Sequence, residues 1–156
     1  KPMGLVPGHT STIRRIEGGM LSYQADMDYT VNPFELGLGR LVDLEMDANF
    51  IGKEALKKIK SDGIKRSQVG IEISCTPLKH PNTSYWPIMV GSEEVGYITS
   101  AVYSPRLDKN IALAMMDVNH SAIDTAAETT TPEGNFPIKV VQKPFYDPKK
   151  KITSGS

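Results

Sequence analysis

The feature that most constrains the fold is a series of short, apolar, β-branched segments in the second half of the chain. Four segments have the composition of strands: 69–74, 94–100, 111–116 and 138–141. Proline, glycine and serine interrupt the chain between them at intervals typical of a small sandwich or barrel. The pattern therefore predicts a compact β domain between Ser67 and Pro148.

The first 66 residues have a weaker and mixed periodicity, with too few apolar positions to close a core of their own. Their clearest element is a predicted helix over 52–60, built of strong helix formers, with an apolar stripe against a core and Gly63 placed to end it. A second helix is predicted to start at Asn32 and Pro33, which form a helix start signal, and Gly37 and Gly39 weaken this prediction. At the other end of the chain, residues 149–156 are expected to be a frayed, solvated tail.

Composition excludes several classes of protein. The 18 basic and 18 acidic residues give a formal net charge of zero, which argues against a nucleic-acid binder or a membrane-surface protein. No segment approaches the roughly 18 consecutive apolar residues of a membrane helix. Cys75 is the single cysteine, so no internal disulfide can form. We expect a cytoplasmic protein with no nucleic acid and no membrane among its partners.

Metal catalysis is not expected, because His9, His80 and His120 are scattered without the spacing of a metal site. Cys75 follows a predicted buried strand, where a lone cysteine is usually a small core residue. An aromatic group in the second half either fills the core or forms a cage for a cationic centre such as a sulfonium. Its members are Tyr85, Trp86, Tyr97 and Tyr103.

The most suggestive local cluster is 14–23, in which Glu17 follows two arginines and precedes Gly18 and Gly19. Spacing alone favours a surface ion pair before a turn. The functional alternative is that the carboxylate accepts two N–H donors from a flat heterocycle such as guanine or a pterin. The glycines would then allow close approach, and Tyr23 would line the same pocket.

Several longer stretches match a known pattern over nearly the whole chain, from 13 to 148. They are 15–19, 26–28, 32–38, 49–56, 96–107, 110–114 and 143–148. Together they resemble the aminomethyltransferase family, the T-protein of the glycine cleavage system and its relatives. The resemblance implies an α+β fold: residues 1–66 would be the C-terminal piece of a T-protein-like folate-binding α/β domain, and 67–148 a small antiparallel β-barrel domain, before the tail.

Within that family, the amino-acid sequence of 14–23 and 103–110 is most similar to the branch that demethylates dimethylsulfoniopropionate. This implies transfer of an S-methyl group from a small sulfonium substrate to tetrahydrofolate, giving 5-methyltetrahydrofolate and methylmercaptopropionate without a metal. A sulfonium carries a good leaving group, so alignment of two bound molecules would provide the catalysis and no catalytic side chain is expected here.

Two alternatives remain open. One is the glycine cleavage aminomethyltransferase, which would need a docking surface for a lipoylated carrier protein. The other is a non-catalytic folate-binding module of the same fold. The iron–sulfur-assembly branch of the fold is disfavoured, because this chain has Asn49 where that branch has its hallmark cysteine.

The resemblance also implies three cofactor-binding residues for tetrahydrofolate. Glu17 matches the acidic residue that holds the pterin ring, Tyr23 matches the aromatic residue of the same motif, and Tyr146 lies near a C-terminal tyrosine associated with ligand binding. Ser22 and Gln24 depart from the Leu-Tyr-Gly sequence common in T-proteins, which counts against glycine cleavage.

Members of the family are more than twice as long as this chain, so it is similar to a C-terminal portion. Its start at Lys1, without an initiator methionine or a signal peptide, reads as an internal start. Residues 1–66 would then pack against the missing N-terminal half of the same protein, and we expect this chain alone to be inactive. The oligomeric state is not fixed by the sequence, and a homodimer stays open.

Overall fold

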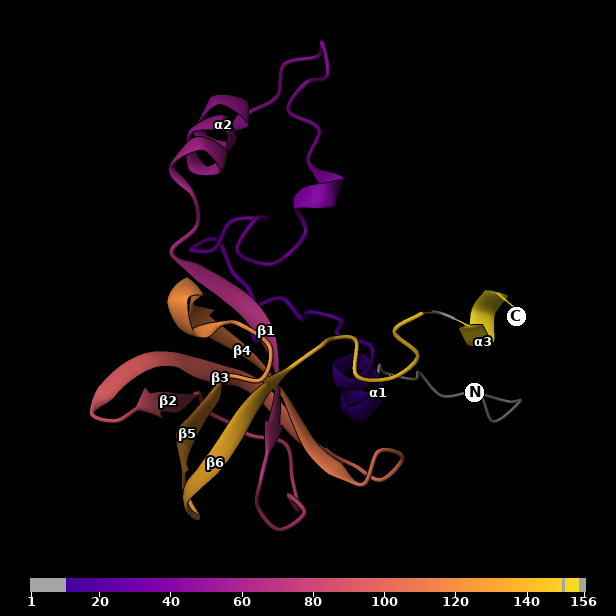
Figure 1. Cartoon of the computed structure of the whole chain (residues 1–156). Coiled ribbons are helices and arrows are strands. Elements are labelled where there is room, and N and C mark those ends of the chain that lie inside the picture. The colour runs from indigo at the N-terminus through magenta and orange to yellow at the C-terminus, as the bar shows by residue number, and fades with distance from the viewer. Residues whose placement is uncertain (1–10, 150, 155–156) are drawn as a thin grey trace, which may run out of the picture.

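The structure is a computed structural model that describes residues 11–149 and 151–154. Its main body is a closed barrel of six antiparallel strands, and a loop-rich segment before the barrel extends away from it (Figure 1). The strand order is β1-β4-β3-β2-β5-β6, and the barrel closes because β6 also pairs with β1. The elements are α1 (Thr12–Glu17), η1 (Gly39–Leu41), α2 (Lys53–Asp62), β1 (Arg66–Ile73), β2 (Trp86–Val90), β3 (Glu93–Ser104), β4 (Lys109–Asp117), η2 (Val118–His120), β5 (Ala126–Thr131), β6 (Gly134–Val141) and α3 (Lys151–Ser154).

The four strands predicted from the sequence are confirmed as β1, β3, β4 and β6, each beginning earlier in the chain than predicted. The sequence analysis missed β2 and β5. β2 contains Pro87, which lacks an N–H donor and weakens a strand prediction. β5 consists of alanine, glutamate and threonine, without a large apolar residue. Both strands form by pairing with their neighbours in the closed barrel. Thr129 of β5 is fully buried and donates its hydroxyl to the Pro87 carbonyl, which joins the two strands.

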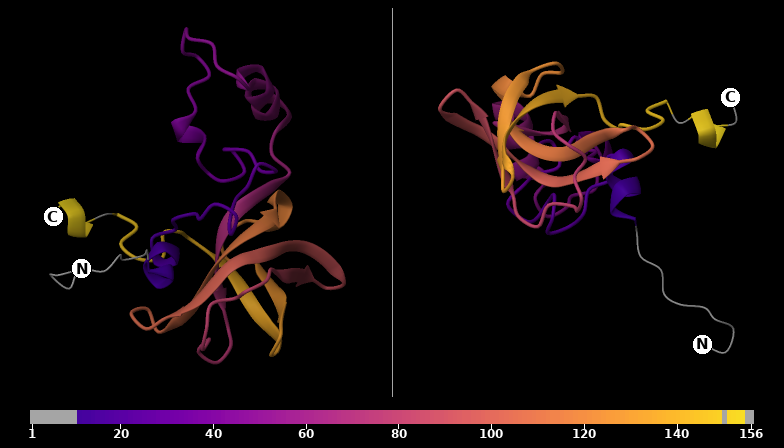
Figure 2. Two further views of the ribbon diagram at one scale, coloured as in Figure 1. Left: turned by 180° about the vertical axis from the view of Figure 1, so that it is seen from behind. Right: turned by 90° about the horizontal axis from the view of Figure 1, so that it is seen from below.

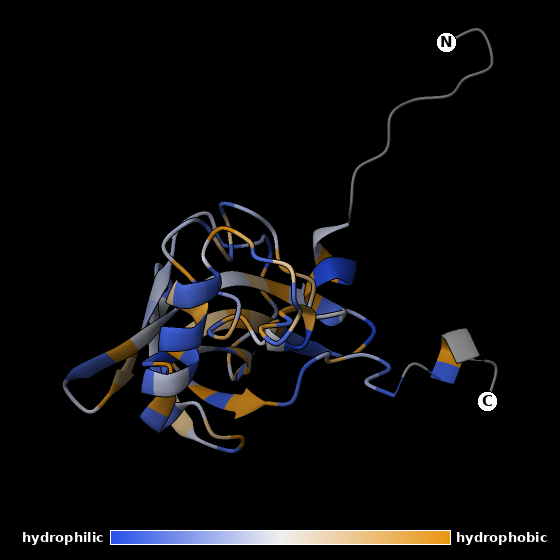
Figure 3. Ribbon diagram, turned by 90° about the horizontal axis from the view of Figure 1, so that it is seen from above, coloured by the Kyte–Doolittle hydropathy of each residue, from blue (hydrophilic) through white to orange (hydrophobic). Residues whose placement is uncertain are grey.

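Alternation along the strands separates two apolar cores. The inner core fills the barrel and includes Ile71, Ile88 and Ile98. Residues between the inward positions point outward, and on β3 and β4 these outward residues form a second core with Ile16 of α1. Figure 3 shows hydrophobic residues in the strands of the barrel, whereas α2 is mostly hydrophilic. Ile16 is fully buried, which stabilises the docked helix by roughly 1.5–3 kcal/mol.

The predicted helix over 52–60 is confirmed as α2, which runs to Asp62 and ends at Gly63. Gly63 has a φ of 81°, a conformation in which glycine carries little strain. The expectation that its apolar stripe packs on a core is wrong for the described residues: Leu56 and Ile59 are only half-buried, and α2 stands away from the barrel (Figure 2).

The helix predicted at Asn32 does not form. The Asn32 side chain does accept hydrogen bonds from the backbone N–H groups of Phe34 and Glu35, as a helix start requires. The chain then makes only a turn over 33–37, because Gly37 enters the left-handed region with a φ of 71°. A start signal therefore needs a continuous helical stretch after it to produce a helix.

Both ends of the described chain contain helices that were not predicted. α1 begins after Ser11, whose hydroxyl caps Arg14 N–H, and ends at Gly18. α3 lies in the segment expected to be a frayed tail, and Asp147 caps it by accepting from the N–H groups of residues 151 and 152. The predicted internal start at Lys1 lies outside the described residues, and the division into domains 1–66 and 67–148 stays a prediction.

Candidate functional site

The site is built on α1, which lies on the outer face of the barrel against β3 and β4. The helix ends in a tight turn, in which Gly19 N–H donates to the Ile16 carbonyl and Met20 N–H to the Arg15 carbonyl. Gly19 has a φ of 64°, which this turn requires. A Cβ on Gly19 would lie 3.6–3.8 Å from Pro144 and Lys143, so the close approach at this glycine is made by the chain's own C-terminal segment.

Glu17 is buried where α1, the end of β3 and the C-terminal segment meet, with 4% of its surface exposed. Ser104 donates its hydroxyl to Oε1 of Glu17 over 2.6 Å, and a guanidinium nitrogen of Arg106 lies 3.8 Å from Oε2. The backbone carbonyl of Glu17 accepts from the N–H groups of Phe145 and Tyr146. The residue thus joins three separate segments, which a solvated surface ion pair would not do.

Arg106 links Glu17 to Tyr146. Its guanidinium carbon lies 4.2 Å from the centre of the Tyr146 ring, which is a cation–π contact, and the side chain is 48% exposed. We call Glu17, Ser104, Arg106 and Tyr146 the Glu17 cluster. It brings together two of the three residues predicted to bind the cofactor. Ser104 and Arg106 carry no role in the sequence analysis, although both lie in the stretch 96–107 that matches the family.

Tyr23 lies in a different place. It belongs to the loop after α1, where it forms a bridge with Met27, and its side chain is 64% exposed. Among the described residues no hydrogen bond, ion pair or ring contact joins it to the Glu17 cluster. Its predicted role in a shared pocket therefore has no support in this part of the chain.

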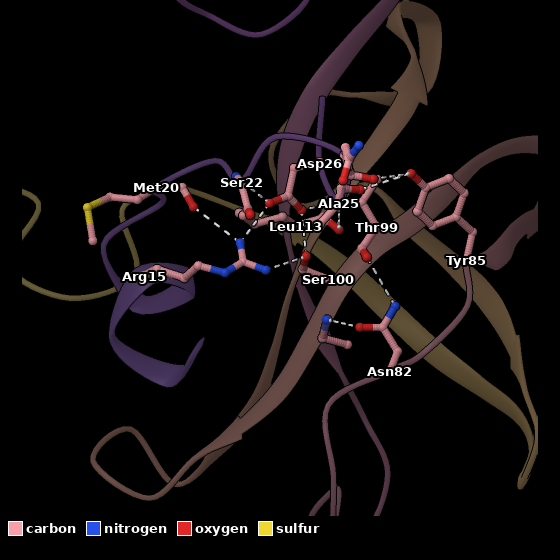
Figure 4. Close-up of polar contacts among 12 residues, drawn as sticks. Arg15, Met20, Ser22, Ala25, Asp26, Asn82, Tyr85, Thr99, Ser100 and Leu113 are labelled. Atoms are coloured by element: carbon pink, nitrogen blue, oxygen red, sulfur yellow. Dashed lines mark hydrogen bonds and ion pairs between the residues drawn. The ribbon is translucent and has the colours of Figure 1, made fainter. Parts of the chain in front are cut away.

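A second polar network fixes the other side of α1 (Figure 4). Arg15 donates from Nη1 to Oδ2 of Asp26 over 2.6 Å and from Nη2 to Ser100 Oγ over 2.8 Å. Thr99 and Ser100 each donate a hydroxyl to Oδ1 of Asp26 over 2.6 Å, and Ser22 N–H donates to Oδ2. The Asp26 carboxylate is fully buried and its oxygens accept four hydrogen bonds, so the network is complete without a ligand.

Next to this network lies a pocket of about 330 Å³ between α1, residues 81–85 and β3. Asn82 shapes its wall by accepting from Ala101 N–H and donating to the carbonyls of Ser84 and Thr99. Tyr85 closes one side and donates its hydroxyl to the Ala25 carbonyl over 3.0 Å (Figure 4). Five of the side chains that line the pocket already have hydrogen-bond partners: Arg15, Asn82, Tyr85, Thr99 and Ser100.

The four aromatic residues considered for a cationic cage are dispersed. Trp86 is buried in the barrel core, and Tyr103 donates its hydroxyl to Asp108 in the hairpin after β3. Tyr85 and Tyr97 stack on each other, with ring centres 5.1 Å apart and an interplanar angle of 20°. A ring that stacks in this way has only one face left for a ligand, so these residues do not form a cage.

Lys143 is the half-buried cation that sequence analysis overlooked at this site. Burial lowers the pKa of its amine to about 8, and the Asp26 carboxylate opposes that shift. Cys75 packs against the inner core, where burial raises the pKa of its thiol. Among the described residues no three histidine, cysteine or acidic side chains are grouped to hold a metal ion, and no described helix could span a membrane.

The family model for the glycine cleavage T-protein C-terminal barrel domain matches residues 66–147, which are the barrel and the segment that contacts Glu17. The chain belongs to the glycine cleavage T-protein family. The resemblance read from the sequence is thereby confirmed at the level of the family, and the predicted antiparallel barrel is the barrel of that family.

Relatives of the T-protein family extend this likeness to α1 and the loops before the barrel. An aminomethyltransferase of Bacillus cytotoxicus is 39% identical over 150 residues, covering 96% of this chain and 39% of that protein. One from Symbiobacterium thermophilum is 40% identical over 146 residues, covering 92% of this chain and 38% of that protein. The chain thus spans about two fifths of the length of the curated relatives it matches.

A solved T-protein structure shares the fold. The glycine cleavage system aminomethyltransferase T from Bartonella henselae superposes with a TM-score of 0.78, covering 87% of this chain and 38% of that chain. Its sequence identity of 21% is low, so this likeness speaks for the fold alone.

Proposed function

We propose that the protein containing this chain is a tetrahydrofolate-dependent aminomethyltransferase, and that this chain supplies the barrel and one wall of its folate site. The observation that carries the proposal is the 36–40% identity to proteins named aminomethyltransferase over more than nine tenths of the chain. In the reaction, the carbon of an aminomethyl group held on a carrier sulfur forms bonds to two nitrogens of tetrahydrofolate as its bonds to sulfur and to nitrogen break, so that methylenetetrahydrofolate forms, ammonia leaves and the carrier keeps a thiol. The names of the relatives favour this reaction over sulfonium demethylation.

We propose that the Glu17 carboxylate binds the pterin ring. Its Oε1 is held by Ser104, but the 3.8 Å to Arg106 is too long for a hydrogen bond, so Oε2 keeps its capacity to accept. Arg106 is about half exposed, and it can swing away and open the carboxylate to an N–H donor of the pterin. Tyr146, which Arg106 covers, then offers a ring face beside the ligand.

The remaining walls of the site, in this proposal, come from a part of the protein outside this chain. The loop-rich segment before the barrel supports this, because Tyr29, Leu41 and Ile51 expose most or all of their side chains. Large apolar side chains in one segment favour burial against a partner surface. We propose that this partner is the N-terminal part of the same protein, that the enzyme works in the cytoplasm, and that a lipoylated carrier protein delivers the substrate.

The test is to incubate the intact protein with tetrahydrofolate and an aminomethylated lipoyl carrier and to follow methylenetetrahydrofolate by mass spectrometry. We expect product at a catalytic rate, and the same protein without the carrier serves as the control. Folate binding without any product from the carrier would overturn aminomethyl transfer and leave only the folate-binding role.

A second candidate is demethylation of dimethylsulfoniopropionate. It is favoured by one specific observation: Ser22 and Gln24 flank Tyr23 where Leu-Tyr-Gly is common in T-proteins. The same assay decides between the two, because a sulfonium donor gives 5-methyltetrahydrofolate, which differs in mass from the methylene product. Formation of the methyl product with the sulfonium, and none with the carrier, would reverse the order of the two candidates.

A further inference from the structure

Lys143 is placed at the turn that presents Glu17. A Cβ built on Gly19 would lie 3.7 Å from the Cβ of Lys143, and Phe145, two residues further on, donates its N–H to the Glu17 carbonyl. No described residue accepts a hydrogen bond from the Lys143 ammonium, although this side chain is half-buried. The amine therefore lies beside the proposed folate site without a protein partner.

Gln68 is a second unpartnered group on the same side of the barrel. It is 3% exposed, and neither its amide nitrogen nor its amide oxygen has a hydrogen-bond partner. Its neighbours Val69 and Ile71 belong to the inner core, so Gln68 points outward, to the face on which α1 packs. A buried amide that lacks both of its partners is costly unless something outside the described chain satisfies it.

The register of the barrel relates the two residues. β1 and β6 are antiparallel, with Gly70 opposite Val141 as the last pair of the ladder. Continuing this register two residues past the last pair sets Gln68 of β1 opposite Lys143, which follows the end of β6. The Gln68 amide and the Lys143 ammonium, both without a hydrogen-bond partner among the described residues, therefore lie at the same end of the β1–β6 ladder.

We propose that Lys143 and Gln68 form a subsite for a carboxylate of the glutamate tail of tetrahydrofolate. This rests on the proposed function and deepens it, because the tail carboxylates are the charged groups of that co-substrate. Arg15, another cation on this face that is largely shielded from water, is already neutralised by Asp26 and donates to Ser100, which leaves Lys143 to meet an anion. The Gln68 NH₂ group can donate to the same carboxylate.

The charges around Lys143 agree with this assignment. Asp26 is the acidic group that acts on the amine, but its oxygens are saturated by four other donors. Glu17, on the neighbouring turn, accepts from Ser104 and has a guanidinium nitrogen of Arg106 3.8 Å from its other oxygen. Among the described residues no acidic side chain forms a hydrogen bond or ion pair with Lys143, so an incoming carboxylate would meet an ammonium without a direct partner.

The experiment compares the affinity of the intact protein for tetrahydrofolate and for tetrahydropteroate, which lacks the glutamate tail. We expect Lys143→Met to weaken tetrahydrofolate binding by roughly tenfold or more and to leave tetrahydropteroate binding unchanged. Lys143→Arg should restore most of the loss. Lys139→Met is the matched control, because that lysine lies on β6 in an exposed pair with Asp124 and should change neither affinity.

Each outcome decides the matter. If Lys143→Met weakens both ligands equally, or neither, the carboxylate subsite is wrong while folate binding stands. If the wild-type protein binds neither ligand, the proposed function itself is overturned, and the subsite with it. Gln68→Leu provides a second variant for which the same loss, confined to the tail-bearing ligand, is expected.

Discussion

Glu17 and Ser104 are 87 positions apart in the chain, yet the Ser104 hydroxyl donates to the Glu17 carboxylate over 2.6 Å. Four residues earlier on the same strand, Ser100 donates to Asp26 and accepts from Arg15, so β3 holds α1 at two points. The position of Glu17 is therefore set by the barrel and not by the short helix that carries it, since a helix of six residues is not stable alone.

Replacing Glu17 tests its assignment to the pterin. Glu17→Gln keeps the shape of the side chain but removes the charge, so tetrahydrofolate should bind more weakly by about 1–3 kcal/mol in calorimetry on the intact protein. Glu72→Gln, which alters a partly exposed pair with Lys109, is the control. An unchanged affinity in Glu17→Gln would remove this residue from the site.

The Asp26 network should contribute to stability more than to binding. Asp26→Asn leaves the Arg15 guanidinium largely buried without a counter-charge, and we expect the free energy of unfolding to fall by about 3–5 kcal/mol in denaturant titration. Asp124→Asn disrupts an ion pair whose two side chains are mostly exposed and should have little effect. Equal losses in the two variants would contradict the importance of burial here.

Lys143 should lower stability in the absence of ligand. The pKa of its amine is lowered to about 8 from 10.5, so the native state disfavours the charged form. This cost is fully present below pH 8 and disappears as the pH rises from about 8 to 10.5. Lys143→Met should therefore raise the free energy of unfolding at pH 7 by about 1–3 kcal/mol, with the gain shrinking across that interval. A gain that is constant with pH would indicate packing instead of charge.

The pH dependence of folate binding tests whether the Lys143 ammonium binds the carboxylate of the folate tail. A bound carboxylate favours the ammonium form, so the advantage of tetrahydrofolate over tetrahydropteroate should fall as the pH rises through about 8. Asp26, Arg15, Glu17 and Arg106 are the other charged groups near this amine. A preference for the tail that stays constant from pH 7 to 10 would count against Lys143 as its partner.

Gly96 on β3 is required by close strand packing. A Cβ there would lie 2.3 Å from the Met115 carbonyl oxygen and 2.8 Å from the Met116 Cα, and backbone atoms cannot move aside cheaply. Gly96→Ala should destabilise the barrel by about 2 kcal/mol or more, measured as a lower midpoint of thermal unfolding. Gly37→Ala is the contrast, because its surroundings are open and only its φ of 71° costs about 1 kcal/mol.

Much of the barrel could be predicted because its strands carry β-branched residues between clear turn signals. β5 could not, since threonine and alanine become strand residues only when neighbours on both sides pair with them. The start signal at Asn32 was read as a helix because capping is visible in sequence, whereas the left-handed turn at Gly37 depends on the fold. Local sequence patterns predict local structure only. β5 was missed because its pairing depends on the barrel, and the helix at Asn32 was wrong because the chain turns at Gly37.

The candidate site shows the same division. Glu17 and Tyr146 could be selected by their family resemblance, but nothing in their spacing indicated that Arg106 would lie between them. Asp26 and Lys143 lie in stretches that match the family, but the sequence indicated no role for either, because a buried ion pair and an unpaired amine depend on contacts between distant segments. Such groups become visible only when the partners of each buried polar atom are counted.

The contacts of the Glu17 carbonyl with Phe145 and Tyr146 also set an order of events during synthesis. The acceptor is made early and its donors emerge from the ribosome 128 and more residues later, after every strand of the barrel. Contacts of such long sequence separation form late in folding. The Glu17 cluster would therefore be the last part of this chain to mature, and a product truncated before Phe145 would lack the two N–H donors that hold the Glu17 backbone.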